Sequence, residues 1–423
     1  MSRPRAVIVV TGSELVRGER TDLNGPFLAR ECLSLGLEPA RIEIVGDSAE
    51  ELAGALEGGL AADLLVTSGG LGPTHDDRTV EVLARILDRP LGVDPALEEE
   101  IGTLSRTFAA RMGRPYADFE AGVRKQASLP AGARSLGLAG TAPALLLEQE
   151  ETVIVVLPGP PRELQHLWPR ALETDALRAL LARATPPGRR VLRFFGASES
   201  AVARALDEAG GDGDGVEATI CARDFEIHVD LVLDPAAERR ADELERALAE
   251  RLEPYLFARG EQAVEELVLE LCRARGLTLA TAESCTGGMV AARLTDVPGS
   301  SDVFLGGLVA YADGVKRKEL GVPVEVLERH GAVSAETAAE MSRGARSRLG
   351  ADVAVSVTGV AGPDGGSAEK PVGLVYLHAA GPDGERSVDF NLRGDRETIR
   401  RRATVSALHL VRRLLTQNGH SPV

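Results

Sequence analysis

The sequence predicts an α/β protein made of three domains. The chain has 423 residues, 44% of them hydrophobic, and at roughly 100–200 residues per domain this length accommodates two to four of them. Its first and last parts alternate short β-branched runs with helical patterns, an order typical of a parallel sheet covered by helices. Between them lies a smaller βαββα pattern. We therefore expect domains at residues 1–169, 170–256 and 257–423.

The first domain shows the order β-α-β-α-β. Its periodicity predicts strands at 6–10, 41–45, 63–67 and 153–157 and helices at 24–35, 49–60 and 77–87. Open sheets of this kind bind ligands at the carboxyl ends of their strands. The loops 11–22 and 68–77 each follow a strand, so we expect the functional groups of this domain there.

The middle domain shows the shorter βαββα order. Its pattern predicts strands at 191–195, 216–221 and 226–233 and helices at 199–208 and 236–252. A glycine-rich turn at its centre carries Asp212 and Asp214, where a nucleic-acid reader would carry Lys or Arg. We therefore expect a connector domain and not an RNA-binding one.

The last domain returns to α/β alternation. Its pattern predicts strands at 278–281, 303–311, 353–357 and 374–378, a helix that ends at 294, and an amphipathic helix at 396–415. This terminal helix favours a homodimer.

Composition and charge exclude several classes of protein. The 48 basic and 64 acidic residues give a net charge of −16, which argues against nucleic-acid or anionic-membrane binding. The apolar run at 6–10 is too short for a signal peptide or a membrane span. The four cysteines are scattered, as in a reduced cytoplasmic protein. We expect a soluble, cytoplasmic protein with no nucleic-acid and no membrane partner.

Ser284 is a candidate nucleophile in the last domain. It follows a predicted strand and precedes two glycines, Gly287 and Gly288, that let a substrate approach the main chain. Backbone N–H groups at a helix N-terminus can stabilise an oxyanion. A serine hydroxyl needs a base to attack, and capping a helix is the commoner role of serine at such a turn.

The scarcity of lysine suggests that base. Only four of the 48 basic residues are lysines, namely Lys125, Lys316, Lys318 and Lys370. Lys316 follows the next predicted strand, so it can approach Ser284. An amine acts as a base only when it is deprotonated, which burial favours for lysine and not for arginine. We expect a Ser284–Lys316 dyad, with Lys318 at a solvated helix start.

Cys285 is the rival nucleophile, because thiolates are more reactive than hydroxyls. Neighbouring side chains of a turn point in different directions, so only one of Ser284 and Cys285 faces the pocket. No histidine stands beside Cys285 in the sequence. Ser284 is therefore favoured.

The loop 68–77 of the first domain, SGGLGPTHDD, follows a strand and opens a helix, as phosphate-binding loops do. We expect its small residues to contact phosphate: Gly69, Gly70, Gly72 and Thr74. Lys125, beside Arg124, would add positive charge for a pyrophosphate. Four carboxylates of this loop and the facing one could hold a divalent cation: Glu14, Asp22, Asp76 and Asp77. Each could instead cap a turn, and Asp77 could be a helix N-cap.

Several motifs together resemble the competence/damage-inducible protein CinA family. In the last domain they are AESCTGG at 282–288, VAYADGVK at 309–316, VTGVAGPDGG at 357–366 with KPVG at 370–373, and GDR at 394–396. The loop 68–77 and the segments 11–24 and 140–144 of the first domain resemble the same family, with departures at Ser13, Leu23 and Ala144. The resemblance covers essentially the whole chain.

The resemblance implies fold and activity for each domain. The first domain is similar to molybdopterin-binding proteins, with a three-layer α/β fold, and the middle one to a KH-like connector. In the family, the first domain is associated with metal-dependent cleavage of ADP-ribose to AMP and ribose 5-phosphate, with Mg²⁺, Mn²⁺ or Co²⁺. The last domain resembles nicotinamide mononucleotide (NMN) deamidase, a serine amidohydrolase that needs no cofactor.

The resemblance also implies roles for single residues of the last domain. Ser284 would be the nucleophile, Lys316 its general base and Thr358 an assisting hydroxyl. Tyr311 and Arg396, or Arg400 in its place, would position the substrate, which suits the phosphate of a mononucleotide. The glycine-rich loop that includes Gly359 and Gly362 would wrap it.

Two other functions stay open at this point. The first domain could merely bind molybdopterin or a nucleotide, in a protein that acts through partners in competence or in the DNA-damage response. A molybdenum-cofactor enzyme is the third possibility, since the loop 68–77 does not exclude pterin binding.

Overall fold

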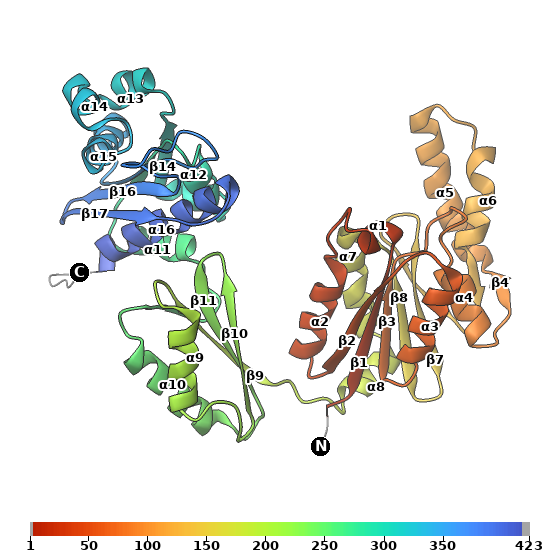
Figure 1. The fold of residues 1–423 in the computed structure, drawn as a ribbon. Coiled ribbons are helices and arrows are strands. Elements are labelled where there is room, and N and C mark those ends of the chain that lie inside the picture. The colour runs from red at the N-terminus through yellow and green to blue at the C-terminus, as the bar shows by residue number, and fades with distance from the viewer. Residues whose placement is uncertain (1–2, 417–423) are drawn as a thin grey trace. The chain divides into compact units, whose positions relative to one another are not determined.

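A computed structural model of the chain describes residues 3–416, which fall into two compact units, one up to residue 188 and one from residue 189 onward. Figure 1 labels the helices and strands along the chain. No helix within the described range is long and apolar enough to cross a membrane.

The first unit is built on a six-stranded sheet with the order β2-β1-β3-β8-β7-β6. The first four strands are parallel neighbours and the last two are antiparallel. The strands are β1 (Arg5–Thr11), β2 (Glu38–Val45), β3 (Leu64–Ser68), β6 (Arg134–Leu138), β7 (Pro143–Gln149) and β8 (Thr152–Leu157). Because successive side chains of a strand point to opposite faces, Ile8 of β1 enters one hydrophobic core and Val9 the other.

Helices cover both faces of this sheet, so the unit has the expected three-layer α/β fold (Figure 1). One face carries α2 (Asn24–Ser34), α7 (Pro161–Leu172) and α8 (Asp175–Leu181). The other carries α3 (Ala49–Gly59), α4 (Thr79–Ile86), α5 (Pro95–Met112) and α6 (Ala117–Gln126). A short helix, α1 (Ser13–Val16), and a small pair of strands, β4 (Leu91–Val93) and β5 (Ser128–Pro130), complete the unit.

The end of the first unit differs from the expected boundary. Helix α7 runs across residue 169, and α8 follows it within the same unit. The reason is packing, since Ala171 of α7 and Leu177 and Leu180 of α8 are buried in the core that α2 covers.

The second unit begins with the connector, a four-stranded sheet with the order β10-β11-β9-β12. It consists of β9 (Gly188–Phe194), α9 (Glu199–Glu208), β10 (Val216–Arg223), β11 (Glu226–Leu233), α10 (Glu238–Arg251) and β12 (Leu256–Arg259). The predicted βαββα order is present, and β12 is an addition to it. This four-residue strand crosses the boundary expected at 256 and pairs with β9.

The last domain has a five-stranded sheet with the order β14-β13-β15-β16-β17. Its strands are β13 (Leu279–Glu283), β14 (Phe304–Val309), β15 (Val353–Gly359), β16 (Leu374–Gly381) and β17 (Gly384–Asn391). The first three in sheet order are parallel, and β16 and β17 are antiparallel. The carboxyl ends of β13, β14 and β15 therefore meet at one edge of the sheet.

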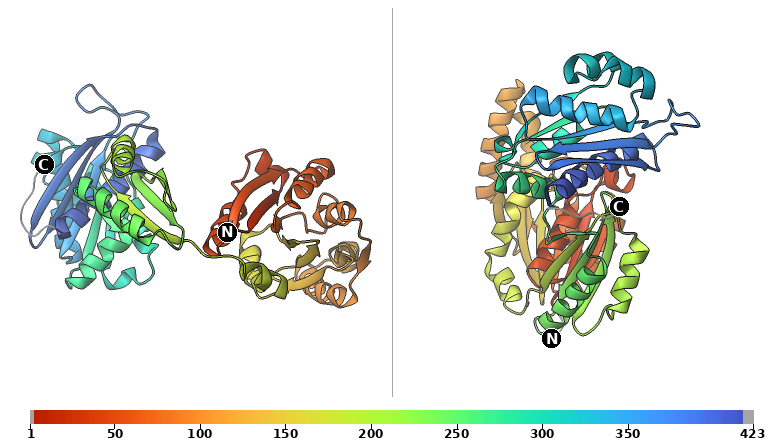
Figure 2. Two further views of the ribbon diagram at one scale, coloured as in Figure 1. Left: turned by 90° about the horizontal axis from the view of Figure 1, so that it is seen from below. Right: turned by 90° about the vertical axis from the view of Figure 1, so that its left-hand side faces the viewer.

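Helices lie on both faces of this sheet as well (Figures 1 and 2). One face carries α11 (Val264–Ala274), α12 (Met289–Thr295) and α16 (Arg396–Thr416), and the other carries α13 (Asp313–Leu320), α14 (Val324–His330) and α15 (Ala335–Leu349). The core under α11 and α16 also takes in Phe195 and Phe257 of the connector. This shared core joins the connector and the last domain into one compact unit.

Candidate functional site

The last domain gathers candidate residues at the carboxyl edge of its sheet. Ser284 follows β13 directly, and its backbone N–H donates to the Val357 carbonyl of β15 at 2.9 Å. Thr358 is the next residue of β15, and Lys316 lies in α13, after the neighbouring β14. The exposed fractions are 7% for Ser284 and 1% for both Lys316 and Thr358. These polar groups therefore lie in a largely desolvated place.

The helix expected after the glycines and ending at 294 is α12, and it begins directly after Gly288. The cap of α12 is Gly288, in the left-handed region at φ 100°, and Ser284 does not cap it. The buried carboxylate of Glu283 does so instead. It accepts from the N–H groups of Gly288 at 2.9 Å, Val290 at 3.0 Å and Ala291 at 2.9 Å.

This arrangement corrects the expected oxyanion site. The N–H groups at the start of α12 are occupied by Glu283, so they are not available to a reacting carbonyl. The N–H groups of Cys285 and Thr286 make no hydrogen bond to another backbone group within residues 3–416, but both lie beside the Cys285 sulfur and favour its thiolate form. Glu283 was missed from the sequence, although an acidic residue before a Gly-Gly turn and a helix start was the available signal.

Lys316 is held away from solvent by its own neighbours. Its Nζ donates to the Tyr311 carbonyl at 2.9 Å and lies 3.6 Å from Oδ1 of Asp313. Burial lowers the pKa of Lys316, while the Asp313 carboxylate opposes that shift. In the described range no hydrogen bond joins Lys316 Nζ to Ser284 Oγ. Such contacts often tighten only when substrate is bound.

The Thr358 hydroxyl is already engaged. It donates to the Ala332 carbonyl at 2.6 Å.

Gly359 and Gly362 are required by packing, since a Cβ on either would lie within 3 Å of Leu374 or Val372 atoms. Their contact with a substrate stays a prediction.

The structure separates the roles of the two candidate arginines. Arg396 donates to the Gly362 carbonyl at 2.7 Å and to the Tyr311 hydroxyl at 3.2 Å. Arg400 donates to the carbonyls of Cys285 at 3.0 Å and Thr286 at 2.8 Å. Arg396 therefore lies with the exposed Tyr311 ring, whereas Arg400 fixes the loop that carries Ser284.

Cys285 is buried, with 5% exposure. Burial raises the pKa of its thiol to about 11. A thiol with this pKa is almost entirely protonated near neutral pH, so it is a poor nucleophile.

The loop 68–77 of the first domain, expected to bind phosphate, borders a cavity of about 650 Å³ at the carboxyl ends of β1 and β3. Gly69 and Gly70 adopt φ of 103° and 66°, and a Cβ at Gly69 would lie 2.5 Å from the Thr11 carbonyl. Asn24 also lines this cavity, although its sequence context did not mark it as a site residue. Its Nδ2 donates to Ser68 Oγ at 2.9 Å and to the Gly159 carbonyl at 2.7 Å, while its buried Oδ1 has no hydrogen-bond partner in the described range.

The second half of the loop is held by its own side chains. Asp77 Oδ2 accepts from the Thr74 N–H at 2.9 Å, and Asp76 and Asp77 both accept from the Thr74 hydroxyl. Asp77 is therefore a turn residue, and the N-cap of α4 is Arg78. Lys125 donates to the Thr74 carbonyl.

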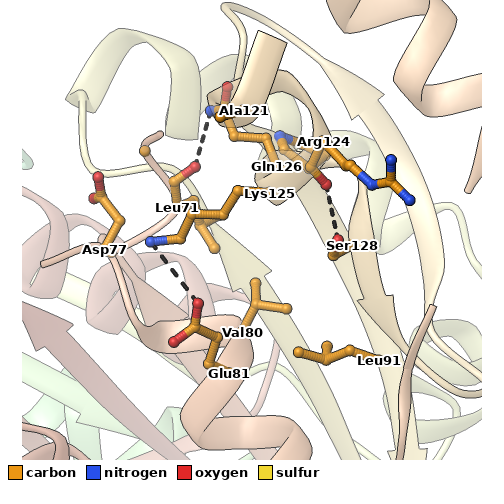
Figure 3. Close-up of a pocket in the computed structure, with 13 residues that line it drawn as sticks. Leu71, Asp77, Val80, Glu81, Leu91, Ala121, Arg124, Lys125, Gln126 and Ser128 are labelled. Carbon is orange, nitrogen blue, oxygen red and sulfur yellow. Dashed lines mark hydrogen bonds and ion pairs between the residues drawn. The ribbon is translucent and has the colours of Figure 1, made fainter. Parts of the chain in front are cut away.

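Lys125 also borders a smaller hollow, of about 400 Å³, on which Gly70 and Gly72 lie as well. In Figure 3 its ammonium lies near Asp77 and is joined to Glu81, at 3.9 Å, whereas the Arg124 guanidinium points away from it. Lys125 is therefore the cation of this pair that lies beside the loop.

The expected four-carboxylate metal site is not formed as a ready-made ligand set. Glu14, Asp22, Asp76 and Asp77 all line the 650 Å³ cavity, but within residues 3–416 no three His, Cys, Asp or Glu side chains are placed to hold one metal ion. Asp22 instead accepts from the N–H of Asn24 at 2.8 Å, at the start of α2. A cation here would need other ligands, such as the phosphates of a substrate.

Three family models match the chain, one for each expected domain. A "Probable molybdopterin binding domain" matches residues 7–178, a "Damage-inducible protein CinA KH domain" residues 189–258, and a "CinA C-terminal domain" residues 261–415. A solved structure of a competence/damage-inducible protein from Agrobacterium tumefaciens is 42% identical; it covers 37% of this chain and 98% of its own, with a TM-score of 0.35.

Relatives match over almost their full length. A CinA-like protein of Mycobacterium avium is 44% identical over 97% of this chain and 98% of its own. One from Mycobacterium tuberculosis is 42% identical over 99% of both chains. The chain therefore belongs to the CinA-like protein family.

Proposed function

We propose that the last domain hydrolyses the amide of NMN, giving nicotinic acid mononucleotide and ammonia. The observation that carries this proposal is the buried Lys316 at the strand ends that also hold Ser284. Burial favours the neutral amine, which is the form that accepts a proton. Arg396, beside Tyr311 and Gly362, supplies a guanidinium for the phosphate of the mononucleotide.

The proposed reaction has two halves. Ser284 Oγ attacks the amide carbon as Lys316 Nζ takes the hydroxyl proton, and the N–H groups of Cys285 and Thr286 receive the oxyanion. Lys316 then gives its proton to the departing ammonia, which leaves an ester on Ser284. Lys316 next takes a proton from water, and the hydroxide cleaves the ester and releases nicotinic acid mononucleotide. Lys316 then returns that proton to Ser284 Oγ.

Ammonia release from NMN tests this proposal. We expect wild type and Cys285→Ser to turn over, and Ser284→Ala and Lys316→Arg to lose about 10³-fold or more in kcat, because nucleophile and base act as a unit. Unchanged turnover in Lys316→Arg would contradict the dyad. Retention in Ser284→Ala with loss in Cys285→Ser would transfer the nucleophile to Cys285.

For the first domain we propose cleavage of ADP-ribose to AMP and ribose 5-phosphate, with a divalent metal that enters with the substrate. Two observations favour this: the glycine loop with Lys125 suits a pyrophosphate, and the unpartnered Asn24 Oδ1 suits a ligand hydroxyl. Mg²⁺ is usually held by one or two carboxylates together with phosphates, and Asp76 and Asp77 are the two at the end of the loop.

Product formation from ADP-ribose checks this second proposal. We expect cleavage with Mg²⁺, Mn²⁺ or Co²⁺, none after chelation with EDTA, and a loss of about 10-fold or more in kcat/KM for Asp76→Asn, with Asp47→Asn of the same cavity as the matched control. Binding of ADP-ribose or molybdopterin without any cleavage would leave the domain a binding module.

A further inference from the structure

Among residues 3–416, Asp313 is the one acidic side chain paired with Lys316. It is the first residue of α13, and Lys316 follows one helical turn later on the same face. The two charges are 3.6 Å apart, and the pair is asymmetric. The Lys316 side chain is 1% exposed, whereas that of Asp313 is 60% exposed.

Two effects act on the Lys316 proton in opposite directions. Removal of the amine from water favours its neutral form, and the nearby carboxylate favours the ammonium. The Tyr311 carbonyl accepts one N–H in either form, since both an amine and an ammonium can donate. The balance between the two forms therefore depends on Asp313.

Other groups around Lys316 come from the loop after β13 and from α15. Besides Asp313, the titratable groups that act on it are Cys285, from the loop after β13, and Tyr311. Cys285 is a protonated thiol, because burial raises its pKa to about 11. On the side of α15, Arg348 donates to the Lys318 carbonyl, two residues further along α13.

We infer that Asp313 is a positioning residue that acts through Lys316: its carboxylate holds the ammonium and opposes loss of the proton. This contact sets the pH at which Lys316 becomes a base, and its catalytic consequence rests on the proposed amide hydrolysis. The simpler alternative is that Asp313 only complements the dipole of α13 at its first turn, where acidic residues are favourable.

The scarcity of lysine makes a direct experiment possible. The full chain labelled with ¹³C,¹⁵N-lysine gives side-chain NMR signals from only four residues, and Lys316→Arg assigns the one of interest. We expect Asp313→Asn to lower the titration midpoint of Lys316 by about 0.3 to 1 pH unit. The matched control is Glu319→Gln, which removes a carboxylate of the same helix at the same three-residue spacing, one that pairs with Lys318 at 3.3 Å. We expect it to leave the midpoint in place.

An unmoved midpoint in Asp313→Asn, or an equal shift in both variants, would overturn the inference. The pH profile of NMN turnover is the second measurement, and its acidic limb should move to lower pH with the midpoint. A shifted midpoint without a shifted limb would support the inference about Asp313 and contradict Lys316 as the base of the proposed reaction. The NMR result stands whether or not NMN is the substrate.

Discussion

Burial distinguishes the two adjacent candidate nucleophiles, Ser284 and Cys285. A hydroxyl can be activated in place by a base, whereas a thiol raised to a pKa of about 11 must lose a proton in a site that disfavours charge. We therefore expect Cys285 to react with iodoacetamide at pH 7.5 at least about 100-fold more slowly than an ordinary exposed cysteine.

Peptide mass spectrometry after timed alkylation measures this. Cys221 is the internal control, because it is partly exposed while Cys285, Cys32 and Cys272 are all buried. Fast modification of Cys285 would mean that the thiol is activated and would reopen its candidacy as nucleophile.

Among single residues, the sequence pointed to those whose type is rare in this chain. Lys316 stood out because arginine replaces lysine almost everywhere else. Glu283 and Asn24 did not stand out, since their importance lies in backbone groups that only the folded loops bring to them. Asp313 was part of a recognised motif, but its pairing with a buried amine was not predicted. A helix start was expected at Lys318, whereas α13 begins at Asp313 and the exposed Lys318 lies in its last turn.

At the scale of elements, Glu283 is the group that joins β13 to α12. Its carboxylate satisfies three N–H groups at the helix start, and its side chain is buried. We expect Glu283→Ala to lower the free energy of unfolding by about 2 to 4 kcal/mol, because three donors lose a charged acceptor. Glu283→Gln should cost less, since an amide oxygen still accepts.

Urea denaturation measures these differences. Glu397→Ala is the matched control, because Glu397 also lies in the first turn of a helix but is 73% exposed and pairs with the exposed Arg401, at 3.5 Å. We expect a change there of about 0.5 kcal/mol or less. Equal losses in the two variants would argue against the capping role of Glu283.

The elements that the sequence predicted well are those whose burial follows a regular pattern. Strands β1, β3 and β8 are almost entirely buried and appear as continuous apolar runs. Helix α14 has no fully buried residue, and its apolar face is short, since only Val326 and Leu327 pack, partly buried, against the core. Strand β17 alternates only between exposed and half-buried positions. Such elements are placed by their neighbours and not by their own periodicity.

At the scale of the whole molecule, the connector and the last domain are joined by a buried polar cluster. Glu226 of β11 accepts from His409 of α16 at 2.8 Å and lies 3.2 Å from His228. The His409 ring stacks on Phe195, with centroids 3.7 Å apart, and its Nδ1 accepts from Arg412 at 3.3 Å. His409 is thus a neutral ring between a carboxylate and a guanidinium. The sequence could not reveal this junction, because Glu226 and His409 are 183 residues apart.

This cluster makes the second unit sensitive to acid. Burial lowers the pKa of His409 to about 4. Burial alone would raise the pKa of Glu226, but hydrogen bonds from His228 and His409 outweigh it and lower that pKa to about 2. Unfolded histidine binds a proton near pH 6.5, so stability is lost as the pH falls from about 6.5 to 4, and Glu226 adds a further loss below about 4.5.

Between pH 7 and 4.5 we expect the second unit to lose about 2 to 3 kcal/mol through His409. His409→Gln, which can still donate to Glu226, should flatten this dependence, whereas His330→Gln, at a histidine that is 33% exposed, should not. Urea unfolding followed by circular dichroism measures it, with the fluorescence of Trp168 reporting the first unit separately. An unchanged slope in His409→Gln would exclude His409 as its source.

Helix α16 fixes the distance and the rotation between two contacts of the last domain. Arg400, near its start, donates a hydrogen bond to the Cys285 carbonyl, and His409, further along, donates to Glu226 of the connector. An α-helix rotates by about 100° and rises about 1.5 Å per residue. The nine residues from Arg400 to His409 therefore span about two and a half turns, so the two contacts lie on opposite sides of the helix. Inserting or deleting a single residue between them would rotate one contact by about 100° relative to the other. Natural variation in the length of this protein should therefore avoid residues 401–408.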